Sequence, residues 1–528
     1  MRRLSTLISD TLWLHKDRVL LEDSDHSWTG SVLDTKIKNI EALLQVTTVE
    51  GSLVGICYPN LAYQGLAILA VLKAKRVPVI LSYDDLINRT QSWLEKIHLD
   101  LMLTTVDLEQ LTYHSINTVA LRPDGEIQHT QRTQNFSVYR NIAPPGTGLV
   151  LYTSGSTGQP KGICVPEEGL ILTCDYLKDY FQLSPETVTA IVLPVCHSMA
   201  LNTQFLPTFF SGGRSAFVNS RLQMNKLFRY INTIQGNFVS LIGEVLRVCW
   251  EEMKMKNLSP NYDVKHVQLA GGIITEKHLK LAAELFPNAT IHKGYGLTEG
   301  IRVTMIDHHN PKFLDNVVGR PLPFLDVQIR TTEGNLALTD EVGEVFVKGP
   351  NVMLGILGNL MSPVGDDGYL GTGDLGSLNF DGQLSIYGRK DSVFKINGLK
   401  VSGLEIERIA TSVGSYVRDS KSILVEDHRK VRNKIILFLE IPKDKHTEFF
   451  SNYFEVFHKA LWQEFKSLSY FPKDIIILPR FPRTSNGKLS IKGLHKYWEE
   501  QNREKLTLET QGNMLFYKID EEYLEEVL

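Results

Sequence analysis

Cysteine is scarce in this chain. Its 528 residues include five, Cys57, Cys164, Cys174, Cys196 and Cys249. The number is odd, and no pair has the two-residue spacing that is typical of zinc and redox sites. The sequence therefore indicates neither a disulfide framework nor a zinc site, and it favours a reducing compartment.

Long apolar runs and an excess of one charge are also lacking. No run approaches the roughly 18 apolar residues of a membrane span. The basic N-terminus reaches Asp10 and then 16–18 (Lys-Asp-Arg) before an apolar core of signal-peptide length can form. A formal net charge of -4 argues against a nucleic acid partner. We expect a cytoplasmic protein without a membrane partner, acting as a monomer or a weak dimer.

The length and the apolar patterns predict a large α/β architecture. A chain of 528 residues is too long for one ordinary domain. Residues 53–57 and 77–81 have buried-strand patterns and 63–75 has helix composition, so a βαβ unit with parallel strands is expected. The same alternation recurs at 101–104, 190–193, 215–218 and 264–269. These segments predict layered parallel sheets with helices.

The texture of the sequence changes twice after this region. From Leu325 onward, short strands and turns predict a small antiparallel, barrel-like part at about 320–388. After Arg389 the pattern becomes a mixture of helix and strand. We therefore expect a large N-terminal domain at 1–388 and a smaller α+β C-terminal domain at 389–528.

A polar stretch at 152–162 (YTSGSTGQPKG) follows the apolar run 148–151. Bare backbone N–H groups, small hydroxyls and one lysine are what a phosphate-binding loop needs, although the same residues also suit a surface turn. The stretch is not a Walker loop, because the residues after Lys161 predict a strand and not the start of a helix.

Six motifs occur in order along the chain. They are YTSGSTGQPKG (152–162), GYGLTEG (294–300), GEVFVKGPNVMLG (343–355), DDGYLGTGDLG (366–376), GRKDSVFKINGLKVSGLEIE (388–407) and PRTSNGKL (482–489). This series closely resembles the superfamily of adenylate-forming enzymes, which includes acyl-CoA synthetases, adenylation domains of nonribosomal peptide synthetases and firefly luciferase. The resemblance covers nearly the whole chain, and the order and spacing make it specific.

The resemblance implies an enzyme that binds ATP, Mg²⁺ and a small-molecule carboxylic acid. The loop at 153–161 would hold the β- and γ-phosphates, Tyr295 would lie against the adenine, and Asp374 would accept from the ribose hydroxyls. The residues that it implies for the nucleotide are Thr153, Ser154, Gly155, Ser156, Thr157, Lys161, Gly271, Gly272, Lys293, Gly294, Tyr295, Asp374 and Arg389. Lys293 departs from the family, which often has Asn or Gln there. A lysine has donors only, so adenine reading would pass to backbone carbonyls.

Four residues match the family's catalytic positions. Lys488 would contact the attacking carboxylate and the α-phosphate, and Thr298 and His197 would lie beside that phosphate. Glu299 would be the magnesium ligand, since hard cations take oxygen ligands. Considered one at a time, without the series of motifs, these residues would also fit structural roles: Glu299 in a helix cap, Asp374 in a turn and Lys488 in a solvated loop.

The resemblance assigns the acid pocket to three stretches, 193–202, 241–245 and 270–273. Its predicted lining residues are Ser198, Leu201, Asn202, Gly243, Glu244, Ala270 and Gly271. The acid that holds the α-amino group in peptide synthetases has no counterpart between Pro194 and Phe210. Glu244 lies in an apolar segment and needs a partner, which is either Arg247 or an ammonium group on the substrate. An amino or imino acid is the predicted substrate.

The family's C-terminal domain rotates between adenylation and thioester formation. Asp391 matches the hinge and Gly398 the tunnel for a phosphopantetheine thiol, where the lack of a side chain leaves room. The motifs at 395–407 and 482–489 favour loading of a separate carrier protein. An acyl-CoA or aryl-CoA ligase that uses free coenzyme A is the alternative, and an inactive AMP-binding paralogue is a third hypothesis.

Overall fold

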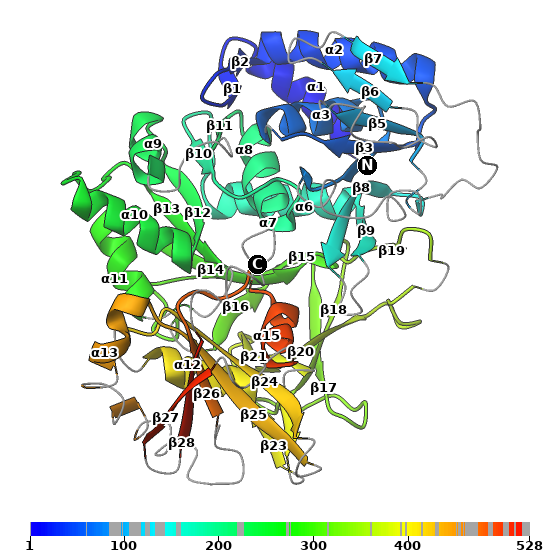
Figure 1. The fold of residues 1–528 in the computed structure, drawn as a ribbon. Coiled ribbons are helices and arrows are strands. Elements are labelled where there is room, and N and C mark those ends of the chain that lie inside the picture. The colour runs from blue at the N-terminus through cyan, green and yellow to red at the C-terminus, as the bar shows by residue number, and fades with distance from the viewer. Residues whose placement is uncertain are drawn as a thin grey trace. The chain divides into compact units, whose positions relative to one another are not determined.

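The computed structural model separates the chain into two compact units. Unit 1 consists of Met1–Glu341, Val345–Thr372 and Leu378–Ser385, and unit 2 of Val342–Glu344, Gly373–Ser377 and Ile386–Leu528. Figure 1 draws both units. The residues that the structure describes are 2–59, 61–83, 97, 99–104, 118–121, 127–131, 143–154, 160–218, 226–270, 274, 276–313, 316–359, 362–390, 393–396, 399–412, 416–427, 432–449, 451, 456–457, 459, 474–483, 489–499, 506–511 and 514–519.

The smaller sheet of unit 1 contains the predicted βαβ unit. Strand β3 (Leu53–Cys57), helix α3 (Leu61–Lys73) and strand β4 (Val77–Ile80) follow one another, and β3 pairs with β4 in parallel. Both strands are entirely buried, as apolar strands in a covered parallel sheet should be. The strand order in the described residues is β19-β9-β8-β4-β3-β5-β6-β7. Its other members are β5 (Leu101–Thr104), β6 (Thr118–Leu121), β7 (Ile127–Gln131), β8 (Thr147–Ser154), β9 (Pro160–Pro166) and β19 (Gly355–Ile356).

The larger sheet combines parallel and antiparallel strands. Neighbours from β10 to β14 pair in parallel, whereas β14, β15 and β16 pair antiparallel. Its order is β17-β18-β20-β21-β16-β15-β14-β13-β12-β10-β11-β1-β2. The strands are β1 (Val19–Glu22), β2 (Ser27–Thr29), β10 (Val188–Ile191), β11 (Arg214–Phe217), β12 (Phe238–Ile242), β13 (His266–Ala270), β14 (Thr290–Leu297), β15 (Gly300–Asp307), β16 (Val317–Pro321), β17 (Asp326–Arg330), β18 (Gly343–Lys348), β20 (Leu370–Leu378) and β21 (Leu384–Arg389). The predicted antiparallel part thus continues a sheet whose centre is parallel.

Helices cover these sheets. Helices α10 and α11 lie beside β12 and β13 (Figure 1), and α3 contacts β3 and β4. Besides α3, the described helices of unit 1 are α1 (Leu4–Leu14), α2 (Gly30–Thr47), α6 (Glu167–Tyr180), α7 (Ser198–Ala200), the π-helix η1 (Leu201–Phe205), α8 (Leu206–Phe210), α9 (Leu227–Thr233), α10 (Gly243–Met255) and α11 (Glu276–Leu285).

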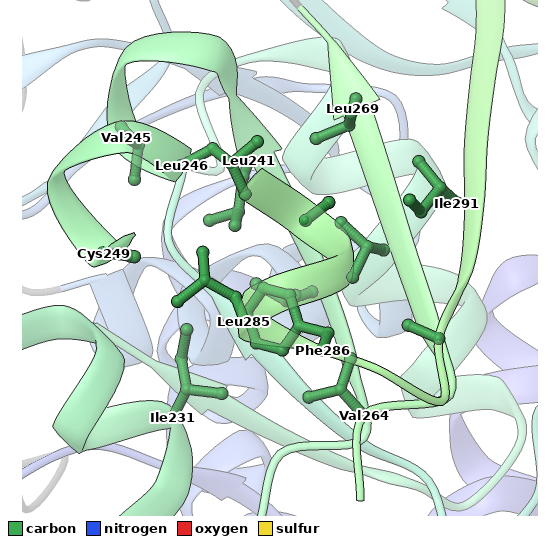
Figure 2. Close-up of a cluster of buried hydrophobic side chains, with 14 of the residues drawn as sticks. Ile231, Leu241, Val245, Leu246, Cys249, Val264, Leu269, Leu285, Phe286 and Ile291 are labelled. Carbon is green, nitrogen blue, oxygen red and sulfur yellow. The ribbon is translucent and has the colours of Figure 1, made fainter. Parts of the chain in front are cut away.

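An apolar core fixes α10 and α11 against the larger sheet. Leu241 and Ile291 from the strands meet Leu246 and Leu285 from the helices, as Figure 2 shows. All four side chains are at most 3 % exposed. Because burial of each such side chain contributes roughly 1.5–3 kcal/mol, this cluster sets the position of the loops that follow β12 and β13.

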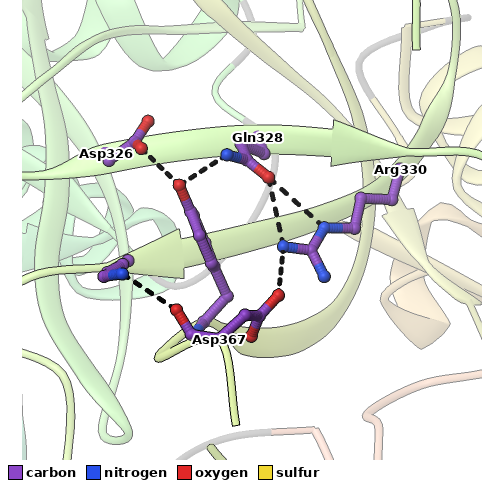
Figure 3. A network of polar contacts seen from close by, with 6 residues as sticks. Asp326, Gln328, Arg330 and Asp367 are labelled. Atoms are coloured by element: carbon purple, nitrogen blue, oxygen red, sulfur yellow. Dashed lines mark hydrogen bonds and ion pairs between the residues drawn. The ribbon is translucent and has the colours of Figure 1, made fainter. Parts of the chain in front are cut away.

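A polar network ties β17 to the loop before β20. Arg330 donates to Asp367 Oδ2 at 2.7 Å and to Gln328 Oε1 at 3.1 Å, and the Tyr369 hydroxyl donates to Asp326 (Figure 3). The Arg330 guanidinium also lies 4.8 Å from the Tyr369 ring centroid. These groups satisfy one another's charges and hydrogen bonds, so their role is structural. The resemblance assigns none of them to the active site.

Unit 2 is built on a sheet with the order β24-β25-β26-β28-β27. Alternate residues of β25 face two clusters, Ile435 and Leu437 on one side and Ile436 and Phe438 on the other, as the period of two in a strand requires. The elements are β22 (Val393–Ile396), β23 (Leu399–Ser402), α12 (Gly403–Ser412), β24 (Asp419–Asp427), β25 (Arg432–Glu440), the 3-10 helix η4 (Lys443–Lys445), α13 (His446–Glu448), β26 (Asp474–Leu478), α15 (Ile491–Glu499), β27 (Leu506–Gln511) and β28 (Met514–Ile519).

All five cysteines are buried and carry free thiols. This agrees with the absence of a disulfide framework that the sequence predicts. Among the described residues, the helices are too short or too polar to span a bilayer. The mixed α/β elements confirm the predicted fold class.

Candidate active site

Strands β8 and β9 form an antiparallel hairpin around the predicted phosphate loop. Thr153 lies opposite Lys161, and both side chains are partly exposed. Ser154 is the last residue of β8, opposite Pro160. The chain after Lys161 continues as strand β9, which confirms that this is not a Walker loop. The loop itself, with Gly155, Ser156 and Thr157, lies outside the described residues.

Strands β14 and β15 form a second hairpin, and Thr298 and Glu299 occupy its tip. Leu297 pairs with Gly300, so these two residues make a two-residue turn. The Met353 N–H donates to the Glu299 carbonyl at 2.8 Å, which fixes the turn against the chain that leads to β19. Both side chains are partly exposed. The turn therefore presents a hydroxyl and a carboxylate from a fixed backbone.

Lys293 and Tyr295 lie on β14, just before this turn. The Lys293 ammonium donates to the Phe313 carbonyl and lies 4.8 Å from the centroid of the Phe313 ring. Its side chain is thus occupied by a backbone acceptor and an aromatic face. The Tyr295 N–H donates to Thr304 Oγ1 at 3.3 Å. This contact pairs Tyr295 with β15.

Asp374 and Arg389 approach each other in unit 2. Arg389 Nη1 lies 3.3 Å from Asp374 Oδ1, and the arginine side chain is 51 % exposed whereas the aspartate is 12 % exposed. Gly373, which directly precedes Asp374, has a φ of +72°, and a Cβ at this position would lie 2.8 Å from Arg389 Nη2. Glycine is needed at this position both for the backbone conformation and for the arginine.

The first pocket stretch passes from β10 into a buried helical segment. His197 is partly exposed, but its Nε2 atom is buried. Ser198 begins α7, and the Asn202 amide donates to its hydroxyl at 3.1 Å. Leu201 and Asn202 are at most 1 % exposed and lie in the π-helix η1. Single π-helical turns are frequent at functional sites.

The second stretch lies beside Ala270, the one described residue of the third stretch, at the carboxyl ends of neighbouring strands. Ile242 pairs with Ala270 in the parallel pair of β12 and β13, and Gly243 begins α10. A Cβ on Gly243 would lie 2.5 Å from His278 Nε2, so glycine allows α11 to approach. The carboxyl edge of a parallel sheet is the usual location of ligand sites in α/β proteins.

Gln268 joins the first stretch to these strands. Its Oε1 accepts from the Ser240 hydroxyl at 3.2 Å and lies 3.4 Å from Thr203 Oγ1. These three side chains are at most 3 % exposed. Residues directly next to the first and second predicted pocket stretches therefore meet on β13, two residues before Ala270.

Two amides near this point carry buried polar atoms without hydrogen-bond partners in the described part of the chain. They are Asn202, through Oδ1, and Gln204, through both Oε1 and Nε2. Such atoms are costly to bury and suit a polar ligand or water. Sequence reasoning overlooked Gln204 and Gln268. The available signal for Gln268 was its position between the apolar residues Val267 and Leu269, whereas Gln204 follows two polar residues and had no such signal.

Glu244 lies in the first turn of α10, where a carboxylate is favoured by the helix dipole. Its side chain is outside the described atoms. Arg247, its predicted partner, forms an ion pair with Glu251 one turn further along the helix. Five further predicted residues lie outside the described residues, namely Gly271, Gly272, the hinge Asp391, the tunnel glycine Gly398 and the catalytic Lys488.

The chain belongs to the family of AMP-binding enzymes, whose sequence model matches residues 12–357. This confirms the resemblance to adenylate-forming enzymes. A long-chain-fatty-acid–CoA ligase from Yersinia pestis is 25% identical over 268 residues, 50% of this chain and 47% of the relative. The 4-coumarate–CoA ligase 4 of Arabidopsis thaliana is 26% identical over 326 residues, 58% of this chain and 56% of the relative. The chain thus spans about half the length of these curated relatives.

Solved structures share the fold over most of the chain. ATP-bound MatB from Rhodopseudomonas palustris has a TM-score of 0.78 at 17% identity, covering 94% of this chain and 99% of that one. McyG A-PCP complexed with phenylalanyl-adenylate has a TM-score of 0.75 at 20% identity, covering 94% and 95%. At such identities the likeness establishes the fold alone.

Proposed function

We propose that this protein activates a carboxylic acid with ATP and passes the acyl group to a thiol. The carboxylate oxygen attacks the α-phosphate, the bond to the bridging oxygen breaks, and pyrophosphate leaves. The thiol sulfur then attacks the acyl carbon and loses its proton, and AMP leaves with the bonding electrons. The observation that carries the proposal is the pairing of Ile242 with Ala270 at the carboxyl ends of β12 and β13, with Thr203 in contact with Gln268 of β13. Strand β14 of the second hairpin is the other neighbour of β13.

The nucleotide residues of the proposal follow the motifs. Thr153 and Lys161, facing each other across the β8–β9 hairpin, would hold the leaving pyrophosphate. Thr298 would donate to the α-phosphate, and Asp374 would accept from the ribose hydroxyls. Because the reaction needs no protein nucleophile, fixed donors and cations around the phosphates would provide the catalysis.

The metal of the proposal is Mg²⁺, held by Glu299. The fixed turn offers one partly exposed carboxylate. That donor set suits Mg²⁺, which is commonly bound by one or two carboxylates together with phosphate and water oxygens. When bound, the ion would neutralise charge on the phosphates.

The acceptor of the proposal is the phosphopantetheine thiol of a separate carrier protein. The C-terminal motifs and the fold shared with a structure titled as an A-PCP protein support it. Free coenzyme A is the second candidate, because the relatives from Yersinia pestis and Arabidopsis thaliana are both named CoA ligases.

The acid of the proposal is an amino or imino acid. Glu244, in the first turn of α10, supplies a carboxylate for the substrate ammonium. The ion pair between Arg247 and Glu251 gives the arginine a partner other than Glu244 and is compatible with this role.

Acid-dependent exchange between ATP and pyrophosphate tests the proposal. We expect exchange with at least one member of a panel of amino, imino, short fatty and aryl acids, and none when Mg²⁺ is removed. Transfer to coenzyme A is then compared with transfer to a phosphopantetheinylated carrier. AMP binding with a flat exchange profile over the whole panel would instead support an inactive paralogue.

A further inference from the structure

Arg302, on β15, is a buried cation that the motifs leave unexplained. The residue is only 7 % exposed to solvent. Its Nε atom is buried without a hydrogen-bond partner, and no carboxylate among the described residues lies within ion-pair distance of the guanidinium. A buried guanidinium normally has an anionic partner, because removing the charge from water is costly.

In the described part of the chain, the groups that interact electrostatically with Arg302 provide no negative charge at neutral pH. Tyr176 and Tyr180 of α6 are its electrostatic neighbours, and burial raises the pKa of both phenols. His292, which is hydrogen-bonded to Tyr180 at 3.2 Å, is also neutral, since burial lowers its pKa to about 3. Burial likewise lowers the pKa of Arg302 to about 10, so the group stays charged at pH 7. The positive charge of Arg302 is therefore not neutralised by the described groups around it.

The backbone of Arg302 is held in an uncommon conformation. Its φ is 55°, a region that non-glycine residues seldom adopt and that is concentrated at functional sites. The buried Asn351 amide donates to the carbonyls of both Ile301 and Arg302, the latter at 2.8 Å. Asn351 in turn lies against α6, where a Cβ on Gly169 would be 2.4 Å from the Asn351 Cα. The fold thus constrains the residue that carries the guanidinium.

Arg302 abuts the predicted nucleotide motif. A Cβ on Gly294 would lie 2.3 Å from Arg302 Nη1, and a Cβ on Gly296 would lie 2.7 Å from the Arg302 nitrogen. Gly294 is on β14, the neighbour of β13, whose last residue Ala270 belongs to the predicted pocket. The Arg302 guanidinium therefore lies against β14, which carries predicted nucleotide-binding residues and neighbours the pocket strand β13.

We propose that Arg302 binds a second anionic group on the acid that this protein activates. The substrate class is then a dicarboxylic acid, including an amino acid with an acidic side chain. A guanidinium can bind a carboxylate through two parallel hydrogen bonds, and one of them would satisfy the Nε donor that lacks a partner. This assignment rests on the proposed function and makes Arg302 a specificity-determining residue.

The test compares acids with their amides in the wild-type protein and in Arg302→Gln. The pairs are glutamate and glutamine, aspartate and asparagine, and glutarate and its monoamide. In pyrophosphate exchange, we expect the wild type to prefer the acid of a pair by roughly 10- to 100-fold, the range for a lost hydrogen bond to a charged group. Arg302→Gln should abolish or reverse that preference.

A matched control is Arg214→Gln. Arg214 donates to Glu22 at 2.9 Å and to the Ile234 carbonyl at 2.7 Å, so its role is structural. This variant should lower the unfolding temperature and leave the preference between acid and amide unchanged. Arg302→Gln should retain the unfolding temperature, because it removes a buried charge that lacks a partner. A large loss of stability in Arg302→Gln would assign Arg302 a structural role and overturn the proposal.

Further outcomes separate this proposal from the proposed function. A wild type that prefers the amides, or an unchanged preference in Arg302→Gln, overturns the role of Arg302 while exchange itself upholds the ligase. A raised KM for ATP with an unchanged acid preference would assign Arg302 to the phosphates and also overturn it. If no acid supports exchange, stabilisation of the wild type but not of Arg302→Gln by glutarate alone would still support an anion site.

Discussion

The Lys293 side chain already has binding partners within the protein. Its ammonium donates to the Phe313 carbonyl and packs over the Phe313 ring. A lysine in this arrangement cannot accept a hydrogen bond from an adenine amino group. That backbone carbonyls read the adenine of a bound nucleotide stays a prediction.

Lys488 gives the prediction that belongs to the residue scale. Replacement of Lys488 by Ala should reduce acid-dependent pyrophosphate exchange by at least about 100-fold, because a fixed cation at a developing charge contributes on that order. Thioester formation from supplied acyl-adenylate should be largely retained. Both half-reactions are measured on the same preparation. Normal exchange in the variant would contradict the assignment.

At the scale of elements, β13, β14 and α6 enclose a chain of neutral polar groups. His266 Nδ1 lies 3.1 Å from His292 Nε2, and the other ring nitrogen of His292 meets the Tyr180 hydroxyl. Burial, together with the nearby His266, His308 and His309, lowers the pKa of His292 to about 3. The folded state therefore excludes a proton that the unfolded chain binds below pH 6.5.

This arrangement predicts a pH dependence of stability. Between about pH 6.5 and 3 the unfolded state binds more protons at His292, so the free energy of unfolding should fall as the pH falls. His292→Gln should make that slope shallower by up to about 1.4 kcal/mol per pH unit. Urea unfolding at pH 4.5, 5.5 and 6.5 measures it. His495→Gln on α15 is the control, and an equal change of slope in both variants would refute the role of His292.

At the scale of the whole molecule, the chain forms two units, and unit 2 collects three separate segments. We propose that 389–528 is a mobile domain that carries Lys488 and turns about Asp391. A turn of this kind concentrates a large backbone change in one or two residues between rigid bodies.

The hinge is tested by Asp391→Pro. Proline fixes φ near -65° and so removes the backbone freedom that rotation needs. We expect thiol transfer to slow by about 10-fold or more, with adenylation affected much less. Stopped-flow adenylation and thioester formation give the two rates. An equal loss in both steps would locate the hinge elsewhere.

Local patterns predicted much of the fold because their causes are local. The βαβ unit at β3, α3 and β4 follows from apolar runs and helix composition, and the strand after Lys161 follows from its sequence. The continuation of the antiparallel strands from the parallel sheet depends on pairing between distant segments, such as β16 with β21. Hydrophobic periodicity carries no information about such pairing.

The candidate site was predictable only where a motif marks it. Thr298 and Glu299 were identified by their motif, and the structure adds the turn and its tie to Met353. Gln268 and Arg302 belong to no motif, and their importance comes from burial and from neighbours on other strands. Those properties arise from tertiary packing, which a single sequence does not specify.

The scarce thiols have a consequence for how the molecule meets its chemical surroundings. Burial raises the pKa of Cys164 to about 11 and also raises those of Cys174 and Cys249. Thiol reagents and oxidants attack the thiolate, so these three buried thiols should react slowly in the native chain. Labelling of these sulfurs would require opening of the folded core. The rate at which a thiol reagent reacts would then measure how often the core opens, without any labelling site having to be engineered into the protein.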